Sequence, residues 1–231
     1  KKTVTFTMPD DKDVVLSTGE LVMENGLPDC LDGTKGDGWE YSNGKLYLND
    51  ETYDFSNTNP QTKTGSPTNQ AVLCAIVISS GAKITGGTFE KIVINSGTIE
   101  NGIFDGTVTN DTGGTISGGT FASDKTVKNK GIITGNGTFN GEVANLGTIK
   151  DGAFNGKVTN YLGRTISGGT FKGTVENNNG EITGGIFTAG LSKNDGSVTG
   201  GVFNGKTGLT NALHVTVTDG SVSQVNGEDP L

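Results

Sequence analysis

The sequence has few of the residues that build a compact hydrophobic core. Only 31% of its 231 residues are hydrophobic, whereas 39 are glycine. A compact domain of this length normally carries more aliphatic and aromatic side chains. The composition therefore favours either a disordered chain or a repeat fold with a thin core, and the spacing of the apolar residues decides between them.

Positive charge is also scarce, which limits the classes of partner. The chain has a net charge of −8, a single arginine, Arg164, and a single histidine, His214. Nucleic acids and anionic membranes attract basic surfaces, so we expect neither a nucleic-acid partner nor membrane insertion. No apolar run approaches the ~18 residues of a membrane span. One histidine cannot build a multi-histidine metal centre, and we expect no metal and no cofactor.

Cysteine is nearly absent, with Cys30 and Cys74 as its two instances. These residues either form a disulfide or are two separately buried thiols, and two cysteines are too few to define a disulfide framework. The chain does not begin with methionine, and we interpret it as part of a longer protein.

Three apolar positions recur along most of the chain and reject disorder. The first recurs at steps of 15 to 17 residues, at Ile84, Ile99, Ile116, Ile133, Ile149, Ile166, Ile182 and Val198. The second holds eight of the ten phenylalanines: Phe89, Phe104, Phe121, Phe139, Phe154, Phe171, Phe187 and Phe203. The third comprises Val93, Val108, Val127, Val143, Val158, Val175, Leu191 and Leu209. Such a period is typical of a repeat protein whose units stack on one another.

The repeat chemistry indicates strands rather than helices. Glycine pairs separate the first and second apolar positions, and each glycine would destabilise a helix by roughly 1 kcal/mol. β-Branched residues flank the apolar positions and suit strands. We therefore predict an all-β fold, a single-stranded parallel β-helix with about 16 residues per rung. Each rung would hold a short strand, a glycine corner, a second short strand and a polar corner, with right-handed coiling as in most parallel crossovers.

Asparagine forms a fourth column, two residues after the third apolar position. Its members are Asn95, Asn110, Asn129, Asn145, Asn160, Asn177 and Asn211. Residues two apart on a strand share a face, so these amides could point inward and bond to one another along the axis. Alternatively, they are ordinary turn residues that tolerate a left-handed backbone.

The repeats divide the chain into four parts. Residues 1–20 form a strand or the remnant of a preceding surface-repeat domain, and 21–80 form an N-terminal β cap with hairpin-like strands and the first strands of the solenoid. Residues 81–212 hold the regular rungs, and 213–231 a terminal strand and tail. The cap contains the chain's one possible ligand platform, formed by aromatic residues that could stack on sugars or instead plug the solenoid end: Trp39, Tyr41, Tyr47 and Tyr53.

Two motifs resemble bacterial surface proteins. FTMPDDKDV, within the first 20 residues, resembles the closing strand of small β-sandwich repeat modules. W-x-Y-x(4)-L-Y-L-N followed by GTISGGTF units resembles repeat-containing, adhesin-like cell-surface proteins of Gram-positive anaerobic bacteria over about residues 38–211. The resemblance implies a parallel β-helix located outside the cell, at the surface or in the cell wall. It implies no particular ligand and no site residue.

The repeats contain no arrangement that predicts catalysis. Gly200 to Thr207 matches a phosphate-loop pattern, but no helix-length pattern follows it and the match falls in repeat register. We therefore predict a non-enzymatic extracellular repeat module, adhesin-like or a structural spacer, without catalytic residues. Its partner would be a host or bacterial glycan or a surface protein. The alternative is a carbohydrate-binding or polysaccharide-processing β-helix, which would need paired carboxylates in one cleft for hydrolysis.

Overall fold

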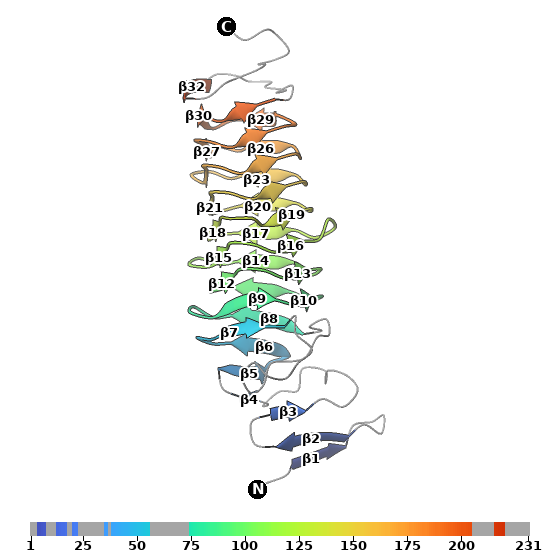
Figure 1. Cartoon of the computed structure of the whole chain (residues 1–231). Helices are drawn as coiled ribbons and strands as arrows, with labels where there is room; N and C mark the ends of the chain where they lie inside the picture. The colour runs from blue at the N-terminus through green and yellow to red at the C-terminus, as the bar shows by residue number, and fades with distance from the viewer. Residues whose placement is uncertain are drawn as a thin grey trace.

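The protein is described by a computed structural model that covers three short strands near the N-terminus, Lys35–Gly36, residues 38–55, residues 74–204 and Val215–Asp219. All regular structure in these residues is β-strand. Parallel strands stack along one axis into a solenoid of about eight turns, as Figure 1 shows. The predicted all-β parallel β-helix is therefore confirmed.

Three sheets, whose strands are parallel in the regular turns, run along the solenoid, and each is named here for its inward residue. The valine sheet consists, in chain order, of β4 Lys35–Gly36, β5 Trp39–Ser42, β6 Lys45–Leu48, β8 Ala75–Ile78, β11 Val93–Asn95, β14 Val108–Asn110, β17 Val127–Asn129, β20 Val143–Asn145, β23 Val158–Asn160, β26 Val175–Asn177 and β29 Leu191–Asn194. The isoleucine sheet consists of β7 Thr52–Asp54, β9 Lys83–Gly86, β12 Thr98–Ile99, β15 Thr115–Ile116, β18 Ile132–Ile133, β21 Thr148–Ile149, β24 Thr165–Ile166, β27 Glu181–Ile182, β30 Ser197–Gly200 and β32 Val215–Asp219.

The phenylalanine sheet consists of β10 Thr88–Phe89, β13 Ile103–Phe104, β16 Thr120–Phe121, β19 Thr138–Phe139, β22 Ala153–Phe154, β25 Thr170–Phe171, β28 Ile186–Phe187 and β31 Val202–Phe203. A separate antiparallel sheet near the N-terminus is made of β1 Val4–Thr7, β2 Asp13–Ser17 and β3 Glu20–Val22. Each regular turn thus has three strands, and the prediction of two was wrong.

The third corner of each turn, which the sequence did not predict, lies between the phenylalanine and valine strands. In four of the turns the second residue after the phenylalanine is a glycine, namely Gly106, Gly141, Gly156 and Gly173. A Cβ atom on any of these glycines would lie 2.0–2.1 Å from a carbonyl oxygen of the preceding turn. Close backbone approach, and not a glycine pair, therefore marks this corner, which is why the repeat pattern concealed it.

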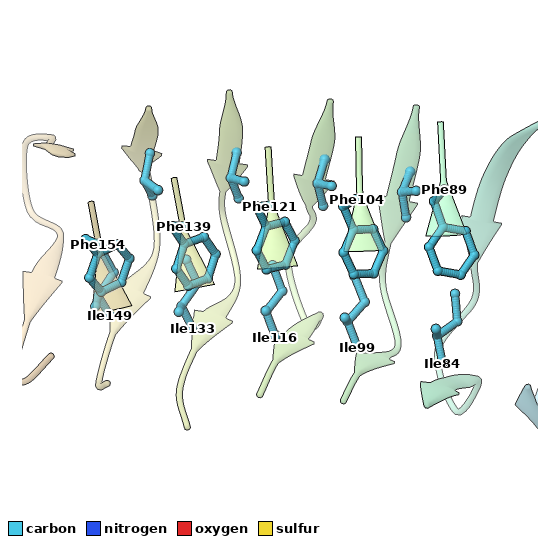
Figure 2. Close-up of a cluster of buried hydrophobic side chains, with 14 of the residues drawn as sticks. Ile84, Phe89, Ile99, Phe104, Ile116, Phe121, Ile133, Phe139, Ile149 and Phe154 are labelled. Carbon is cyan, nitrogen blue, oxygen red and sulfur yellow. The ribbon is translucent and has the colours of Figure 1, made fainter. Parts of the chain in front are cut away.

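The core consists of columns of identical side chains, drawn in Figure 2. In-register pairing places Phe89 beside Phe104, and the same register holds at the following phenylalanine strands. Neighbouring rings of the eight-membered stack lie 4.5–4.9 Å apart between centroids, with interplanar angles of 3–14°. This separation matches the spacing of paired strands, so the backbone repeat itself sets the stacking.

The glycine two residues before a phenylalanine is needed for two reasons. Gly152 has a φ of +134°. Residues other than glycine rarely adopt this backbone conformation. A Cβ atom there would also lie 3.0 Å from the Phe154 ring and 3.3 Å from the Phe139 ring. The glycine corner and the phenylalanine stack therefore depend on each other.

The N-terminal end of the solenoid is closed by an incomplete turn and a hairpin. β6 and β7 pair in parallel with β8 and β9 and continue the inward columns. β5 folds back antiparallel on β6 through Asn43 and Gly44, whose φ values are 51° and 67°. Two consecutive positive φ values define a type I′ hairpin turn, for which Asn-Gly is the preferred sequence. The hairpin predicted in this segment is confirmed.

Three of the predictions concern residues near the ends of the described segments or outside them. Cys74 is buried and disulfide-bonded, whereas Cys30 lies outside the described residues. β32 pairs in parallel with β30, which adds a terminal strand to the isoleucine sheet. Leu209 and Asn211, expected on the third and fourth columns, lie outside the described residues.

Candidate functional site

The aromatic cluster of the cap lies mostly inside the protein. Trp39, Tyr41 and Tyr53 are buried, with exposed fractions of 6%, 4% and 6%, and Tyr47 is half-buried. The rings of Trp39 and Tyr41 meet edge to face, 5.7 Å apart at an angle of 76°. This packing is what a plug requires, whereas a stacking platform needs exposed rings with coplanar faces.

Hydrogen bonds and burial fix Tyr53 in the same role. Its hydroxyl donates to the carbonyl oxygens of Gly38, at 2.5 Å, and Asn49, at 3.1 Å. Burial is the main cause of a raised pKa at Tyr53, and it also raises the pKa of Tyr41. Phe55 joins Tyr53 to the core, because its ring packs edge to face against Phe89 at 5.5 Å.

Trp39→Ala is expected to lower the free energy of unfolding by about 3 kcal/mol, the lower end of the range for large aromatic truncations. The lower end applies because Trp39 packs at the end of the core and its buried Nε1 has no hydrogen-bond partner among the described residues. Chemical denaturation monitored by circular dichroism measures the change. Trp39→Phe, which keeps most of the apolar surface and removes the unpaired N–H, should cost less than half as much. Equal losses in the two variants would contradict the plug.

The inward asparagines form a continuous chain of amides. Nδ2 of each donates to Oδ1 of the next at 2.7–2.9 Å, from Asn95 to Asn194. All seven are buried. Most of the amides also donate, at 3.1–3.4 Å, to the carbonyl oxygen of the first residue of the isoleucine-sheet strand in the next turn. The inward ladder is therefore the correct interpretation, and the ordinary turn role is not.

One ladder member was missed in the sequence. Asn194 follows Leu191 by three residues, not two, because a register shift opposite Val175 and Glu176 adds one residue to β29. The shift restores the inward direction at Asn194, so the column continues to the last complete turn.

Some of the charged side chains on the outer faces form pairs of opposite sign. Ion pairs join Lys83 to Glu100 at 2.8 Å and Lys157 to Glu176 at 2.8 Å. The second contact raises the pKa of Lys157, chiefly through the hydrogen bond with Glu176. In the part of the chain that the structure describes, no group of three or more histidine, cysteine or acidic residues could hold a metal ion. In the same residues, no helix has the length and apolarity of a membrane span.

Two surface features stand out from this regular exterior, and sequence reasoning found neither. Residues 161–164 form a turn between the valine and isoleucine sheets with an exposed Tyr161 (39%) and Leu162 (73%). A shallow hollow of about 420 Å³ lies at the opposite corner, between the isoleucine and phenylalanine sheets. We call it the glycine hollow. Its lining includes Gly184, Gly185, Gly201, Ile186, Val202 and Asp151.

The phosphate-loop match does not form a recognisable nucleotide site in the described residues. Gly200 ends β30 and Val202–Phe203 forms β31, so the first half of the match is a normal solenoid corner. The second half lies outside the described residues. Comparison with protein families, curated proteins and solved structures finds no match to this chain. We therefore infer its function from its own residues.

Proposed function

We propose that this chain is a non-enzymatic module displayed outside a bacterial cell, where it acts as an adhesin-like element or a rigid spacer. The observation that carries the proposal is the unbroken core. The phenylalanine stack and the asparagine chain pass through successive turns without a gap in either column. A structure of this kind maintains its length, about 38 Å for eight turns at roughly 4.8 Å each.

The distribution of charge supports the same proposal. Hydrolysis of a glycoside needs two carboxylates that face one cleft. Five acidic residues of the described outer faces instead pair with lysines, as at Asp111 and Lys130, 2.6 Å apart. The pKa of Asp124 is lowered, chiefly by its hydrogen bond with Lys125, which is the opposite of what a general acid requires. A polysaccharide-processing enzyme is therefore the less favoured alternative.

A combined binding and turnover assay tests the proposal. The purified chain is applied to an array of bacterial and host glycans and to immobilised extracellular-matrix proteins, and in parallel it is incubated with the same polysaccharides. We expect binding without new reducing ends for an adhesin, and neither binding nor new ends for a spacer. New reducing ends above a heat-denatured control, on any polysaccharide, would overturn the non-enzymatic proposal.

A further inference from the structure

The turn at 161–164 has a structural twin elsewhere in the solenoid. Residues 111–114 form the same turn, and in both turns the fourth residue's N–H donates to the first residue's carbonyl oxygen, at 2.9 Å and 3.0 Å. The third residue is a glycine with positive φ in each case, 90° at Gly113 and 70° at Gly163. The inward asparagine of each turn anchors the fourth carbonyl oxygen, at 3.2 Å and 3.1 Å.

The side chains on the two turns are nevertheless very different. Asp-Thr-Gly-Gly occupies 111–114, whereas Tyr-Leu-Gly-Arg occupies 161–164. Because Asp-Thr-Gly-Gly forms the same turn, the fold does not require Tyr161, Leu162 or Arg164. Tyr161 and Leu162 are adjacent exposed apolar side chains that the fold does not need. Tyrosine and arginine are, with tryptophan, the residues most enriched among interface hot spots.

Arg164 also occupies a position that disfavours a side chain. At the equivalent glycines 114, 131, 147 and 196, a Cβ atom would lie 2.1–2.4 Å from a backbone oxygen of the turn before. The ladder hydrogen bond that follows Arg164, from Thr165 N–H to the Gly147 carbonyl oxygen, is 3.4 Å long. Its counterparts at Thr115 and Thr148 measure 2.8 Å and 2.9 Å. The chain's only arginine is therefore placed where it weakens the local ladder.

The glycine hollow presents apolar side chains and a negative charge that could receive this turn. Stacked glycines in neighbouring turns contribute no side chains to it. Ile186, 44% exposed, and Val202 supply apolar side chains beside Thr170 and Thr183. Asp151 lies in the same lining and supplies a negative charge. An apolar protrusion with an adjacent cation would satisfy both properties, and the turn at 161–164 provides Leu162, Tyr161 and Arg164.

We propose that the turn at 161–164 of one copy of this chain docks into the glycine hollow of a second copy, with Leu162 against Ile186 and Arg164 paired with Asp151. The turn joins the valine and isoleucine sheets, and the hollow lies where the isoleucine sheet meets the phenylalanine sheet. The two surfaces therefore flank the same sheet, in overlapping turns of the solenoid. In the proposed arrangement the turn and the hollow of one copy engage two different neighbours. Such a contact is heterologous, and it generates an open side-by-side row unless its rotation closes the row into a ring.

The size of the contact determines its strength. One four-residue turn in one hollow is smaller than the ~800 Å² per partner that stable complexes bury. We therefore expect association at about 10 μM to 1 mM, where weak transient contacts operate. Modules crowded on a surface would reach this range through their high effective concentration.

Sedimentation velocity across that concentration range tests the proposal. The weight-average sedimentation coefficient of the unmodified chain should rise steadily without a plateau at the dimer. A turn-exchange variant, Tyr161→Asp with Leu162→Thr and Arg164→Gly, carries the sequence of 111–114 and should remain monomeric. A hollow variant, Asp151→Asn with Ile186→Lys, should also remain monomeric. Asparagine is compatible with the fold there, since Asn101 holds the equivalent position, and the introduced lysine would repel Arg164.

Mixing the two variants separates a heterologous contact from other causes of association. One variant keeps an intact hollow and the other keeps an intact turn, so an equimolar mixture should form a dimer and stop there. Leu162→Thr alone, at a site 73% exposed, should retain the fold and weaken association at least fivefold. A constant sedimentation coefficient for the unmodified chain up to about 1 mM, turn-exchange protein that associates like it, or a mixture that stays monomeric would each overturn the proposal. None of these results bears on whether the chain is an enzyme.

Discussion

Phe154→Ala is expected to lower the free energy of unfolding by about 3–5 kcal/mol, the range for removing a fully buried aromatic side chain. Phe154 is 1% exposed and lies between Phe139 and Phe171, with ring centroids 4.8 Å and 4.7 Å away. The turns above and below fix those two rings, so neither can move far into the space. The loss therefore includes a cavity contribution as well as the lost burial, and both neighbours lose a stacking partner.

Thr170→Ala is the matched control for this substitution. Thr170 precedes Phe171 in β25, points to the opposite side of the strand and pairs in register with Ala153. Alanine already occupies this outer column at 153, so the change should shift the free energy of unfolding by less than ~0.5 kcal/mol. The midpoints of urea or guanidinium denaturation report both effects. Similar midpoint shifts for the two variants would contradict the inward assignment of the phenylalanine column.

The columns could be predicted from the sequence because each residue in a column packs against the same kind of residue in the next turn. A phenylalanine at one turn lies directly on the phenylalanine of the next, so the same residue recurs and the period is visible in the chain. The spacing of Asn145, two residues after Val143, made an inward direction one of two interpretations, and the structure decided between them. The three-strand turn could not be predicted in this way, because the second corner depends on backbone contact at residues such as Gly156 and leaves no apolar period.

The surface features were hidden for a different reason. The glycine hollow consists of glycines about 16 residues apart, and only stacking brings them side by side. The turn at 161–164 differs from its twin by substitution and not by length, so its significance appears once the two backbones are seen to be the same. A sequence signal did exist: Arg164 replaces a glycine in a column where glycine recurs at 114, 131 and 147. The signal could be interpreted only once the structure placed a backbone carbonyl oxygen of the preceding turn next to this column.

The chain of inward amides is expected to tolerate an apolar residue at its N-terminal end but not in its middle. Leu48 and Ile78 already occupy this column beside Asn95, as the strand register shows. Asn95 Oδ1 thus accepts no amide from the preceding turn, whereas Asn145 Oδ1 accepts from Asn129 at 2.8 Å. A substitution at 95 lengthens the aliphatic part of the column by one turn, whereas a substitution at 145 divides the amide chain.

Asn145→Leu should therefore lower the free energy of unfolding by about 3–9 kcal/mol, since three buried polar groups lose a partner and each loss costs about 1–3 kcal/mol. The affected groups are Asn129 Nδ2, Asn160 Oδ1 and the Gly147 N–H, which donates to Asn145 Oδ1 at 3.3 Å. Asn95→Leu should cost less than Asn145→Leu by about 1–2 kcal/mol, because one fewer partner loses its hydrogen bond.

Asn155→Ala is the control on the exposed face. It removes an amide–amide hydrogen bond of similar length, 2.8 Å to Asn140, and should cost less than ~1 kcal/mol. Thermal and denaturant unfolding of the three variants measure this order. If Asn145→Leu were no more destabilising than Asn155→Ala, the buried amide chain would not be a stabilising element of the core, and the outer and inner amides would have to be regarded as equivalent.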